Sequence, residues 1–344
     1  MRLVQGLARA SARRHARHAR LKRDAHFLRA GLWITANPKM ARHWRHGQPP
    51  PQLRRAKGIR SRPGLLRTLA SLTWIRSNGT HTIFLPNAYK ADTVLIDPAA
   101  TSVLRVLHSG PVRQASIESR IRLSRHLDTP AFQVLDDGRL IREEFVRGED
   151  FAALPSRARI DAFKTLLAGY TSLCAHEGRG SAGHLFDTAM IASEEIALPQ
   201  ELTAFIVAQT TTLRPDIARW PLVPSHKDMS AENLIVCDGR PVLVDLEWVA
   251  CAAFCYDPLW LIVREAATAH RRDLLEALLD GRLDTELQAL WTAAGLRLPD
   301  NKVAVLVPVI LCSAYDAATS AGVTEPTRFR RYLQRWLGSV QPRY

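Results

Sequence analysis

Two carboxylates and one amide are expected at the same end of a short hairpin. Asp228 and Asn233 precede a strand predicted over 234–237, and Asp245 ends a second strand predicted over 241–245. Carboxylate and amide oxygens are ligands that suit Mg²⁺. A carboxylate that stays clear of the metal can instead face a hydroxyl group. The pattern therefore indicates phosphoryl transfer, in which one group orients the nucleophile and others hold the metal on the phosphates.

Each residue of this group has a distinct expected role. Asn233 and Asp245 hold the metal, and Asp228 accepts or orients the proton of an acceptor hydroxyl. His226 supports the loop by bonding to backbone, and Glu247 either assists the metal or locks the strand. The alternative is purely structural, with Asp228 and Asn233 capping the loop. An H-x-D-x-x-x-x-N pattern alone is weak, but the hairpin and the D-x-E that follow favour the chemical interpretation.

Periodicity and turn residues predict the elements that position this loop. The Asp238-Gly239 pair predicts the turn of the hairpin. The N-terminal half is expected to form a small antiparallel sheet with one inserted helix, and the C-terminal half is expected to be mainly helical apart from the one hairpin. The fold class is therefore α+β. The expected strands are 82–85, 92–97, 102–107, 131–135 and 140–145, and the expected helices are 113–127, 157–174 and several within 258–340; residues 65–75 are either a short helix or a strand.

The segment from His226 to Trp248 resembles the catalytic loop and metal strand of the aminoglycoside phosphotransferase/choline kinase family, which has a protein-kinase-like fold. The later Tyr256-Asp257-Pro258-Leu259 is similar to that family's tyrosine-aspartate element. Upstream, Val103–Val106 resembles the third strand of the family's N-lobe, and the segment from Glu143 to Gly148 resembles its hinge. The resemblance covers roughly residues 75–340.

This resemblance implies a two-lobed, magnesium-dependent kinase that uses ATP or GTP. It implies that Arg105 clamps the phosphates while paired with Glu118, and that Lys227 either neutralises the transferred phosphate or is a plain surface lysine. It places the adenine against the hinge residues Glu143, Glu144, Phe145 and Val146. The expected divisions are a basic and flexible extension over 1–65, an N-lobe over 66–148 and a helical C-lobe over 149–344.

Two departures from the family pattern keep a second interpretation open. The family usually has lysine where Arg105 stands, and arginine grips phosphate with a different geometry. The loop over 86–91 has no glycine, so its backbone approaches phosphate less closely. Lys90 either supplies the missing charge or is solvated. The alternative is therefore a catalytically silent, nucleotide-binding scaffold. The acceptor stays open among amino alcohols, aminoglycosides, sugars and peptide hydroxyls.

The charge of the chain is concentrated at one end. The whole chain has 344 residues and a net charge of +14; residues 1–90 hold 20 Lys and Arg and one acidic residue, which gives +19 and leaves −5 for the remainder. The basic arm is either solvated or binds an acidic partner, an anionic membrane face or nucleic acid; its first 20 residues also resemble a transit peptide. No nucleic-acid-binding motif accompanies it.

Cysteine usage and hydropathy indicate the compartment. The five cysteines form no C-x-x-C pair, so neither a disulfide framework nor a zinc site is expected. No apolar run of about 18 residues predicts a membrane-spanning helix. A reducing, cytoplasmic location is therefore the expectation.

Overall fold

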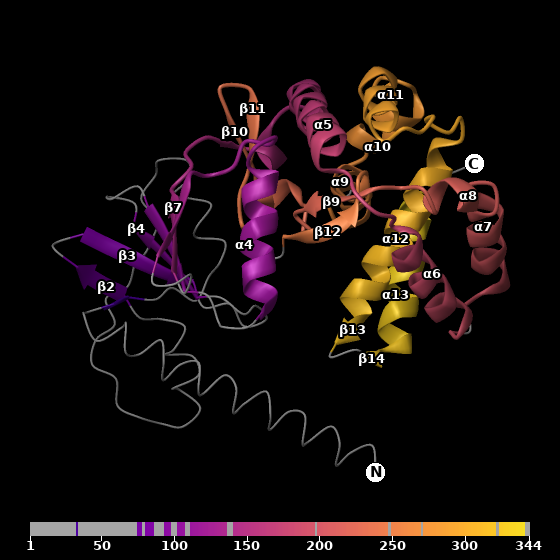
Figure 1. Cartoon of the computed structure of the whole chain (residues 1–344), viewed down its shortest axis with the longest axis horizontal. Helices are drawn as coiled ribbons and strands as arrows, with labels where there is room; N and C mark the ends of the chain where they lie inside the picture. The colour runs from indigo at the N-terminus through magenta and orange to yellow at the C-terminus, as the bar shows by residue number, and fades with distance from the viewer. Residues whose placement is uncertain are drawn as a thin grey trace, which may run out of the picture. The chain divides into compact units, whose positions relative to one another are not determined.

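The computed structural model divides the chain into two compact units. The first comprises residues 1–113 and 130–147, and the second comprises 114–129 and 148–344. The structure describes residues 32–33, 74–77, 80–85, 93–97, 102–106, 111–135, 140–196, 198–246, 249–269, 271–320 and 323–340. The expectations for the basic extension over 1–65, apart from 32–33, and for the loop over 86–91 with Lys90 lie outside these residues. Figure 1 gives the element labels used below.

The described strands of the first unit form one antiparallel sheet. Its strand order is β1-β2-β3-β4-β5-β7-β6, so β7 lies between β5 and β6. Arg105 of β5 stands opposite Val94 of β4 and Ile141 of β7. The strands are β1 (Leu32–Trp33), β2 (Trp74–Ser77), β3 (Thr80–Leu85), β4 (Thr93–Asp97), β5 (Ser102–Val106), β6 (Phe132–Leu135) and β7 (Leu140–Glu144). The five strands predicted from the sequence are confirmed, with small shifts at their ends.

The second unit is mainly helical, as predicted. Helix α5 shows why: Ile160, Phe163, Leu167, Tyr170 and Cys174 recur at intervals of three and four residues and are all buried. The helices are α4 (Pro111–Leu123, of which 114–123 belong to this unit), α5 (Ser156–Glu177), α6 (Gly183–Glu194), α7 (Gln200–Thr210), α8 (Arg214–Ile217), α9 (Tyr256–Thr268), α10 (Asp273–Leu279), α11 (Asp284–Ala293), α12 (Lys302–Ala318) and α13 (Pro326–Val340).

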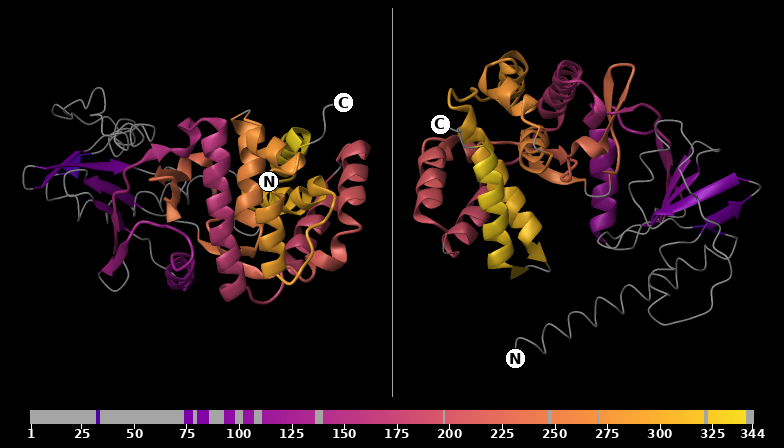
Figure 2. Two further views of the ribbon diagram at one scale, coloured as in Figure 1. Left: turned by 90° about the horizontal axis from the view of Figure 1, so that it is seen from above. Right: turned by 180° about the vertical axis from the view of Figure 1, so that it is seen from behind.

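Helix α12 is central to this packing. It contacts α6, α7, α9 and α13, and its buried residues include Val305, Leu306 and Ile310. Trp260 of α9 and Trp336 of α13 meet edge to face with centroids 4.5 Å apart. The views in Figure 2 show α12 and α13 (yellow) running side by side. The core of this unit thus fixes α9 and α12, which carry residues of the site described below.

The predicted hairpin forms between β10 (Leu234–Cys237) and β11 (Arg240–Leu243). Asp238 and Gly239 have φ angles of 50° and 78°, so the turn uses the left-handed region that this residue pair favours. The prediction that the second strand runs to residue 245 was wrong, because β11 ends at Leu243. Strand β8 (Glu149–Asp150) adds to the other side of β10.

The expectation of a single hairpin among helices was also wrong. Strand β9 (Leu222–Ser225) pairs with β12 (Ala250–Ala253), and β13 (Thr319–Ser320) pairs with β14 (Val323–Thr324). The sequence of β12 is Ala-Cys-Ala-Ala, which contains no β-branched or aromatic residue. Its strand conformation therefore comes from pairing with β9 and not from local preference. In the described part of the chain, no helix is long and apolar enough to span a bilayer.

Candidate active site

His226 opens the loop and is fixed through both ring nitrogens. It follows β9 and is fully buried. Its Nε2 atom lies 2.8 Å from the carbonyl oxygen of Val244, and the backbone N–H of Asp228 donates to Nδ1 at 3.3 Å. Because a carbonyl can only accept, Nε2 carries the proton and Nδ1 is the acceptor. Both nitrogens therefore hold the loop in shape, and neither is left to transfer a proton.

Asp257 organises the same loop from the start of α9. Its fully buried carboxylate accepts the backbone N–H groups of His226 at 2.5 Å and Lys227 at 3.0 Å, and the hydroxyl of Tyr170 at 2.7 Å. A buried carboxylate needs such donors, because the loss of hydration would otherwise be costly. Burial, with the charge of Asp257 adding to it, raises the pKa of Tyr170, so this hydroxyl keeps its proton and donates.

The backbone of Lys227 is bent to make this arrangement. Its φ angle is 65°, in the left-handed region that a non-glycine residue adopts only when the surroundings hold it there. The two successive N–H groups that Asp257 accepts are the contacts that hold it. Lys227 lies directly before Asp228, so its left-handed conformation sets the direction of the Asp228 side chain.

Asp228 is bound by two further residues of the second unit. Nη1 of Arg264, in α9, donates to its Oδ1 at 2.7 Å, and both side chains are about a third exposed, at 30% and 34%. The Nδ2 atom of Asn233 donates to its backbone carbonyl at 2.8 Å. The carboxylate is therefore both oriented and accessible to solvent, as a group that meets a substrate must be.

Asn233 and Asp245 come together through the hairpin. The N–H of Val244 donates to the carbonyl of Asn233 at 2.9 Å, which extends the hairpin pairing by one step beyond Leu243. Asp245 follows with a φ angle of 65°, so the chain turns out of the strand there and the side chain is half-buried. This strain explains why β11 is shorter than predicted, and such strain is common at functional sites.

These two side chains fit a hard divalent cation. The amide nitrogen of Asn233 donates to the loop, so Oδ1 is the atom of this amide that could bind a cation. Within the described residues, His, Cys, Asp and Glu form no cluster of three or more that could hold a metal. A cation here would therefore combine this amide oxygen and the Asp245 carboxylate with water and phosphate oxygens, as Mg²⁺ commonly does. Glu247 lies outside the described residues.

The side chain of Lys227 lines a pocket. Its Nζ donates to Oδ2 of Asp316, in α12, at 2.6 Å and lies 4.3 Å from the ring centre of Tyr256. Burial lowers the pKa of Lys227, but Tyr256 and Asp316 raise it by more, so the net shift is upward. The ammonium group is thus held in an ion pair and over an aromatic face.

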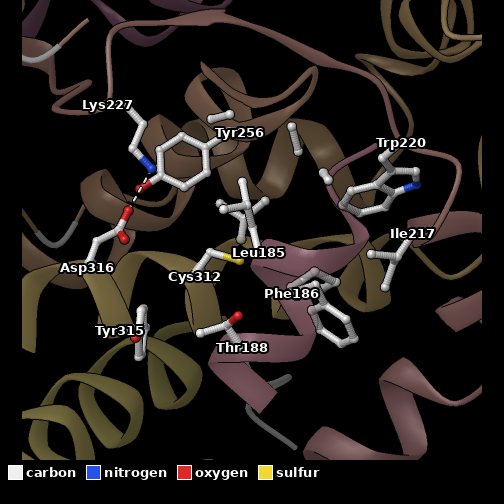
Figure 3. A pocket seen from close by; sticks show the side chains of 15 residues that line it. Leu185, Phe186, Thr188, Ile217, Trp220, Lys227, Tyr256, Cys312, Tyr315 and Asp316 are labelled. Atoms are coloured by element: carbon white, nitrogen blue, oxygen red, sulfur yellow. Dashed lines mark hydrogen bonds and ion pairs between the residues drawn. The ribbon is translucent and has the colours of Figure 1, made fainter. Parts of the chain in front are cut away.

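This pocket lies within the second unit (Figure 3). It is partly open to solvent, and the centre of a water-sized sphere can occupy about 90 Å³ within it. Burial raises the pKa of the Cys312 thiol on its wall to about 12, so that thiol stays protonated. The lining comes from five parts of the chain, which are α6 with the residue before it, the segment from α8 to β9, the loop after β9, β12 with the start of α9, and α12: Ala182, Leu185, Phe186, Thr188, Ile217, Trp220, Lys227, Ala252, Ala253, Tyr256, Pro308, Val309, Cys312, Tyr315 and Asp316.

The remaining predicted residues are distributed over both units. Arg105 lies in β5, with its side chain outside the described part, and Glu118 is exposed on α4 in the second unit. In the hinge segment of the first unit Glu143 and Phe145 are buried, Glu144 is exposed and Val146 is half-buried. The pairing of Arg105 with Glu118 and the contact of the hinge with adenine stay predictions.

Sequence reasoning missed Arg264, Asp316 and Tyr170. Arg264 stands seven residues after Asp257 on the same helix, and that spacing places both side chains on one face. This signal could have found it, because Asp257 was already singled out. Asp316 reaches Lys227 across 89 residues of sequence, and Tyr170 reaches Asp257 across 87. No local pattern marks contacts of that kind.

Comparisons with known proteins give a distant likeness. No family model matches the chain, and no curated protein matches it. Among solved structures it is similar to a choline/ethanolamine kinase family protein from Mesorhizobium loti, at 15% identity and a TM-score of 0.47, covering 75% of this chain and 92% of that one. A putative aminoglycoside phosphotransferase from Ralstonia eutropha matches at 12% identity and a TM-score of 0.45, covering 78% of this chain and 91% of that one.

A macrolide 2'-phosphotransferase from Brachybacterium faecium matches at 16% identity and a TM-score of 0.45, covering 71% of this chain and 87% of that one. At these identities and TM-scores the likeness is a loose one.

Proposed function

We propose that this protein is a magnesium-dependent kinase of the aminoglycoside phosphotransferase/choline kinase type, which moves the γ-phosphate of ATP or GTP to an alcohol hydroxyl. One observation carries the proposal: a single hydrogen-bonded network joins His226, Asp228, Asn233 and Val244, with Asp245 next in the chain. Within this network the carboxylate of Asp228 is held by Arg264 and is 34% exposed, which a residue that served only as a turn would not need.

The residues divide the work as follows. Asn233 and Asp245, together with Glu247, hold Mg²⁺, which when bound neutralises charge on the phosphates. Arg105, steadied by Glu118, binds the phosphates that are not transferred, and the hinge residues 143–146 receive the adenine. His226 keeps the loop in shape through its two ring nitrogens. The ammonium group of Lys227 is engaged by Asp316, which favours a role on the acceptor side over one on the phosphate.

The transfer itself needs one proton acceptor. The acceptor oxygen forms a bond to the γ-phosphorus while the bond from that phosphorus to the β–γ bridging oxygen breaks. The nucleoside diphosphate leaves with the bonding electrons, and the hydroxyl proton passes to the carboxylate of Asp228. Arg264 holds one oxygen of this carboxylate at 2.7 Å and so directs the group toward the acceptor.

The test is nucleotide consumption with and without Mg²⁺ against a panel of amino alcohols, neutral alcohols, aminoglycosides and hydroxyl-bearing peptides. Asp228→Asn is expected to lower turnover by about 100-fold or more while leaving nucleotide binding largely intact. Asp245→Ala is expected to remove the magnesium-linked part of nucleotide binding. Asp238→Asn is the matched control, because it removes a carboxylate from the exposed turn of the same hairpin.

Two outcomes would count against the proposal. Turnover that survives in Asp228→Asn would overturn the assignment of the base. Nucleotide binding without turnover on any acceptor would indicate the silent scaffold instead.

The cysteines and the basic arm indicate the compartment and the partner of the proposed enzyme. All five cysteines are free, which is typical of a reducing compartment such as the cytoplasm. The basic arm, with its charge of +19 over residues 1–90, is proposed to bind an acidic partner or an anionic surface and to take no part in the transfer step.

A further inference from the structure

We propose that the acceptor is an uncharged alcohol with a largely apolar body, bound in the pocket between α6, α9 and α12. This inference rests on the proposed kinase function and names its substrate class. Lys227 lines the pocket and directly precedes Asp228, and consecutive Cα atoms lie about 3.8 Å apart, so the pocket adjoins the loop that carries the proposed base. In the proposed arrangement the hydroxyl of the alcohol lies at this end of the pocket, toward Asp228.

The walls of the pocket are apolar and aromatic. Figure 3 shows Leu185 and Phe186 of α6, Trp220 ahead of β9 and Tyr315 of α12 around one space. The hydroxyl of Thr188, on the same wall, donates to the carbonyl of His184 at 2.8 Å. This hydroxyl is already hydrogen-bonded within its own helix and needs no polar group from a ligand. Such walls favour a hydrocarbon or aromatic body, because binding removes apolar surface from water on both sides.

The charges of the pocket cancel. Lys227 and Asp316 are the two charged residues that line it, and they pair with each other at 2.6 Å. The side chains of Lys227 and Asp316 are 20% and 48% exposed, so water screens this pair in part. A polycationic acceptor needs several carboxylates, whereas this pocket offers one that is already neutralised. An anionic acceptor would likewise have to break the ion pair to use Lys227. Charge complementarity therefore selects a neutral molecule.

The transfer balances as in the general scheme. The alcohol oxygen gains a bond to the γ-phosphorus, the nucleoside diphosphate departs, and the alcohol proton goes to Asp228. The pocket contributes affinity for the body of the molecule, and the loop contributes the chemistry. Acceptor binding can consequently be measured without turnover, in the absence of nucleotide.

The experiment measures binding of straight-chain primary alcohols of four to eight carbons by calorimetry, and then their phosphorylation with Mg²⁺ and ATP. Each added methylene is expected to tighten binding about fourfold, the equivalent of about 0.8 kcal/mol for a buried CH₂. Choline and kanamycin serve as the cationic comparison and are expected to bind at least tenfold more weakly than octanol.

Helix α6 offers a matched pair of variants. Leu185→Glu places a carboxylate on the pocket wall at a half-buried position, and Ile191→Glu places the same carboxylate at a 57% exposed position that does not line the pocket. Leu185→Glu is expected to weaken octanol binding at least tenfold, and Ile191→Glu to change it less than twofold. Thr188→Glu repeats the test at an exposed wall position where folding is not at risk.

The two proposals can fail separately. If kanamycin or choline is phosphorylated while the alcohols show no dependence on chain length, the substrate class is wrong and the kinase function stands. If magnesium-linked nucleotide binding is absent, the kinase function is wrong, whatever the alcohols do. If Leu185→Glu and Thr188→Glu leave octanol binding unchanged, the pocket is not its site and the inference is overturned.

Discussion

Arg264 is the residue that most directly governs Asp228. Its Nη1 atom bonds to Oδ1 of the carboxylate at 2.7 Å and approaches the carbonyl of Met229 at 3.4 Å, so one guanidinium holds the carboxylate against the loop. We expect Arg264→Gln to lower kcat about tenfold with little change in the KM for nucleotide, because the base loses its orientation and not its identity. Arg264→Lys should recover part of the loss, since it keeps the charge but not the planar fork.

Steady-state kinetics of these two variants check the prediction. A purely structural arginine would show the same unfolding midpoint shift for both substitutions and no selective recovery of kcat by lysine. An unchanged kcat in Arg264→Gln would contradict the positioning role.

Asp257 supports the site by binding backbone N–H groups of the loop and not by binding substrate. Its carboxylate takes three donors, from His226, Lys227 and Tyr170. Asp257→Asn turns one acceptor oxygen into a donor that faces another donor, and we expect it to lower the free energy of unfolding by about 2–4 kcal/mol. Tyr170→Phe removes a single donor and should cost only about 1–2 kcal/mol.

Denaturant titration compares the two variants. Equal losses for both would mean that the backbone donors of the loop contribute nothing, which would contradict the reading of Asp257 as the organiser of the loop.

At the scale of elements, two glycines hold the hairpin in place for different reasons. Gly239 sits in its turn at a φ of 78° with open space around it, so an added Cβ meets no atom. A Cβ on Gly148 would lie 2.5 Å from the carbonyl oxygen of Val236 in β10. We expect Gly239→Ala to cost about 1–2 kcal/mol from backbone strain alone, and Gly148→Ala to cost more because β10 must move.

Displacement of β10 would also move Asn233, which directly precedes it. Nucleotide affinity measured beside stability separates the cases. Gly148→Ala should weaken magnesium-linked binding, whereas Gly239→Ala should not. Identical behaviour of the two variants would show that close packing at Gly148 is unimportant.

Helices α4 and α5 are joined by a salt bridge that predicts a pH dependence. Nε of Arg122 donates to Oε2 of Glu177 at 2.6 Å. This hydrogen bond lowers the pKa of Glu177 below its usual 4.5, although burial opposes it, and the charges of Arg122 and Arg125 add to the lowering. A depressed carboxyl pKa contributes stability above the unfolded-state value and loses it as pH falls through the folded-state value.

Glu177→Gln should therefore reduce stability by about 1–3 kcal/mol at pH 7, and the difference from the natural chain should vanish as the pH falls below 4.5. Unfolding curves collected from pH 7 to pH 3 test this. A difference that persists unchanged at pH 3 would contradict the linkage.

The sequence predicts the elements here as far as local signals reach. Asp238-Gly239 predicts the hairpin, and the helical spacing of Phe163, Leu167 and Tyr170 predicts α5. The end of β11 was missed because the backbone of Asp245 turns out of the strand with a φ of 65°. The strand preference of a residue type carries no information about such an effect of the surrounding structure.

At the scale of the whole molecule, the contacts that complete the site join residues far apart in sequence. Arg264 is 36 residues from Asp228, and Asp316 is 89 residues from Lys227. Residue type and spacing predict which groups can do chemistry, but these pairs exist only because α9 and α12 pack beside the loop. The pocket could not have been predicted for the same reason, since its walls come from five separate parts of the chain.

The uneven charge of the chain leads to a prediction about polyanions. Residues 1–90 carry +19 and the remainder carries −5. We expect the protein to bind heparin through the basic segment, and the binding to weaken steeply as salt rises from about 50 to 200 mM, because the contact is electrostatic and screened.

Replacing the three basic residues within 54–57 by Gln should lower the salt concentration at which the protein elutes from heparin more than the same replacement at the exposed Arg157, Arg297 and Arg330. Both variants lose three charges, so net charge alone predicts equal shifts; equal shifts would therefore show that the arm has no special role. Phosphoryl transfer should respond little to either variant, because the loop and pocket belong to the second unit and the residues proposed to bind nucleotide are not among those replaced.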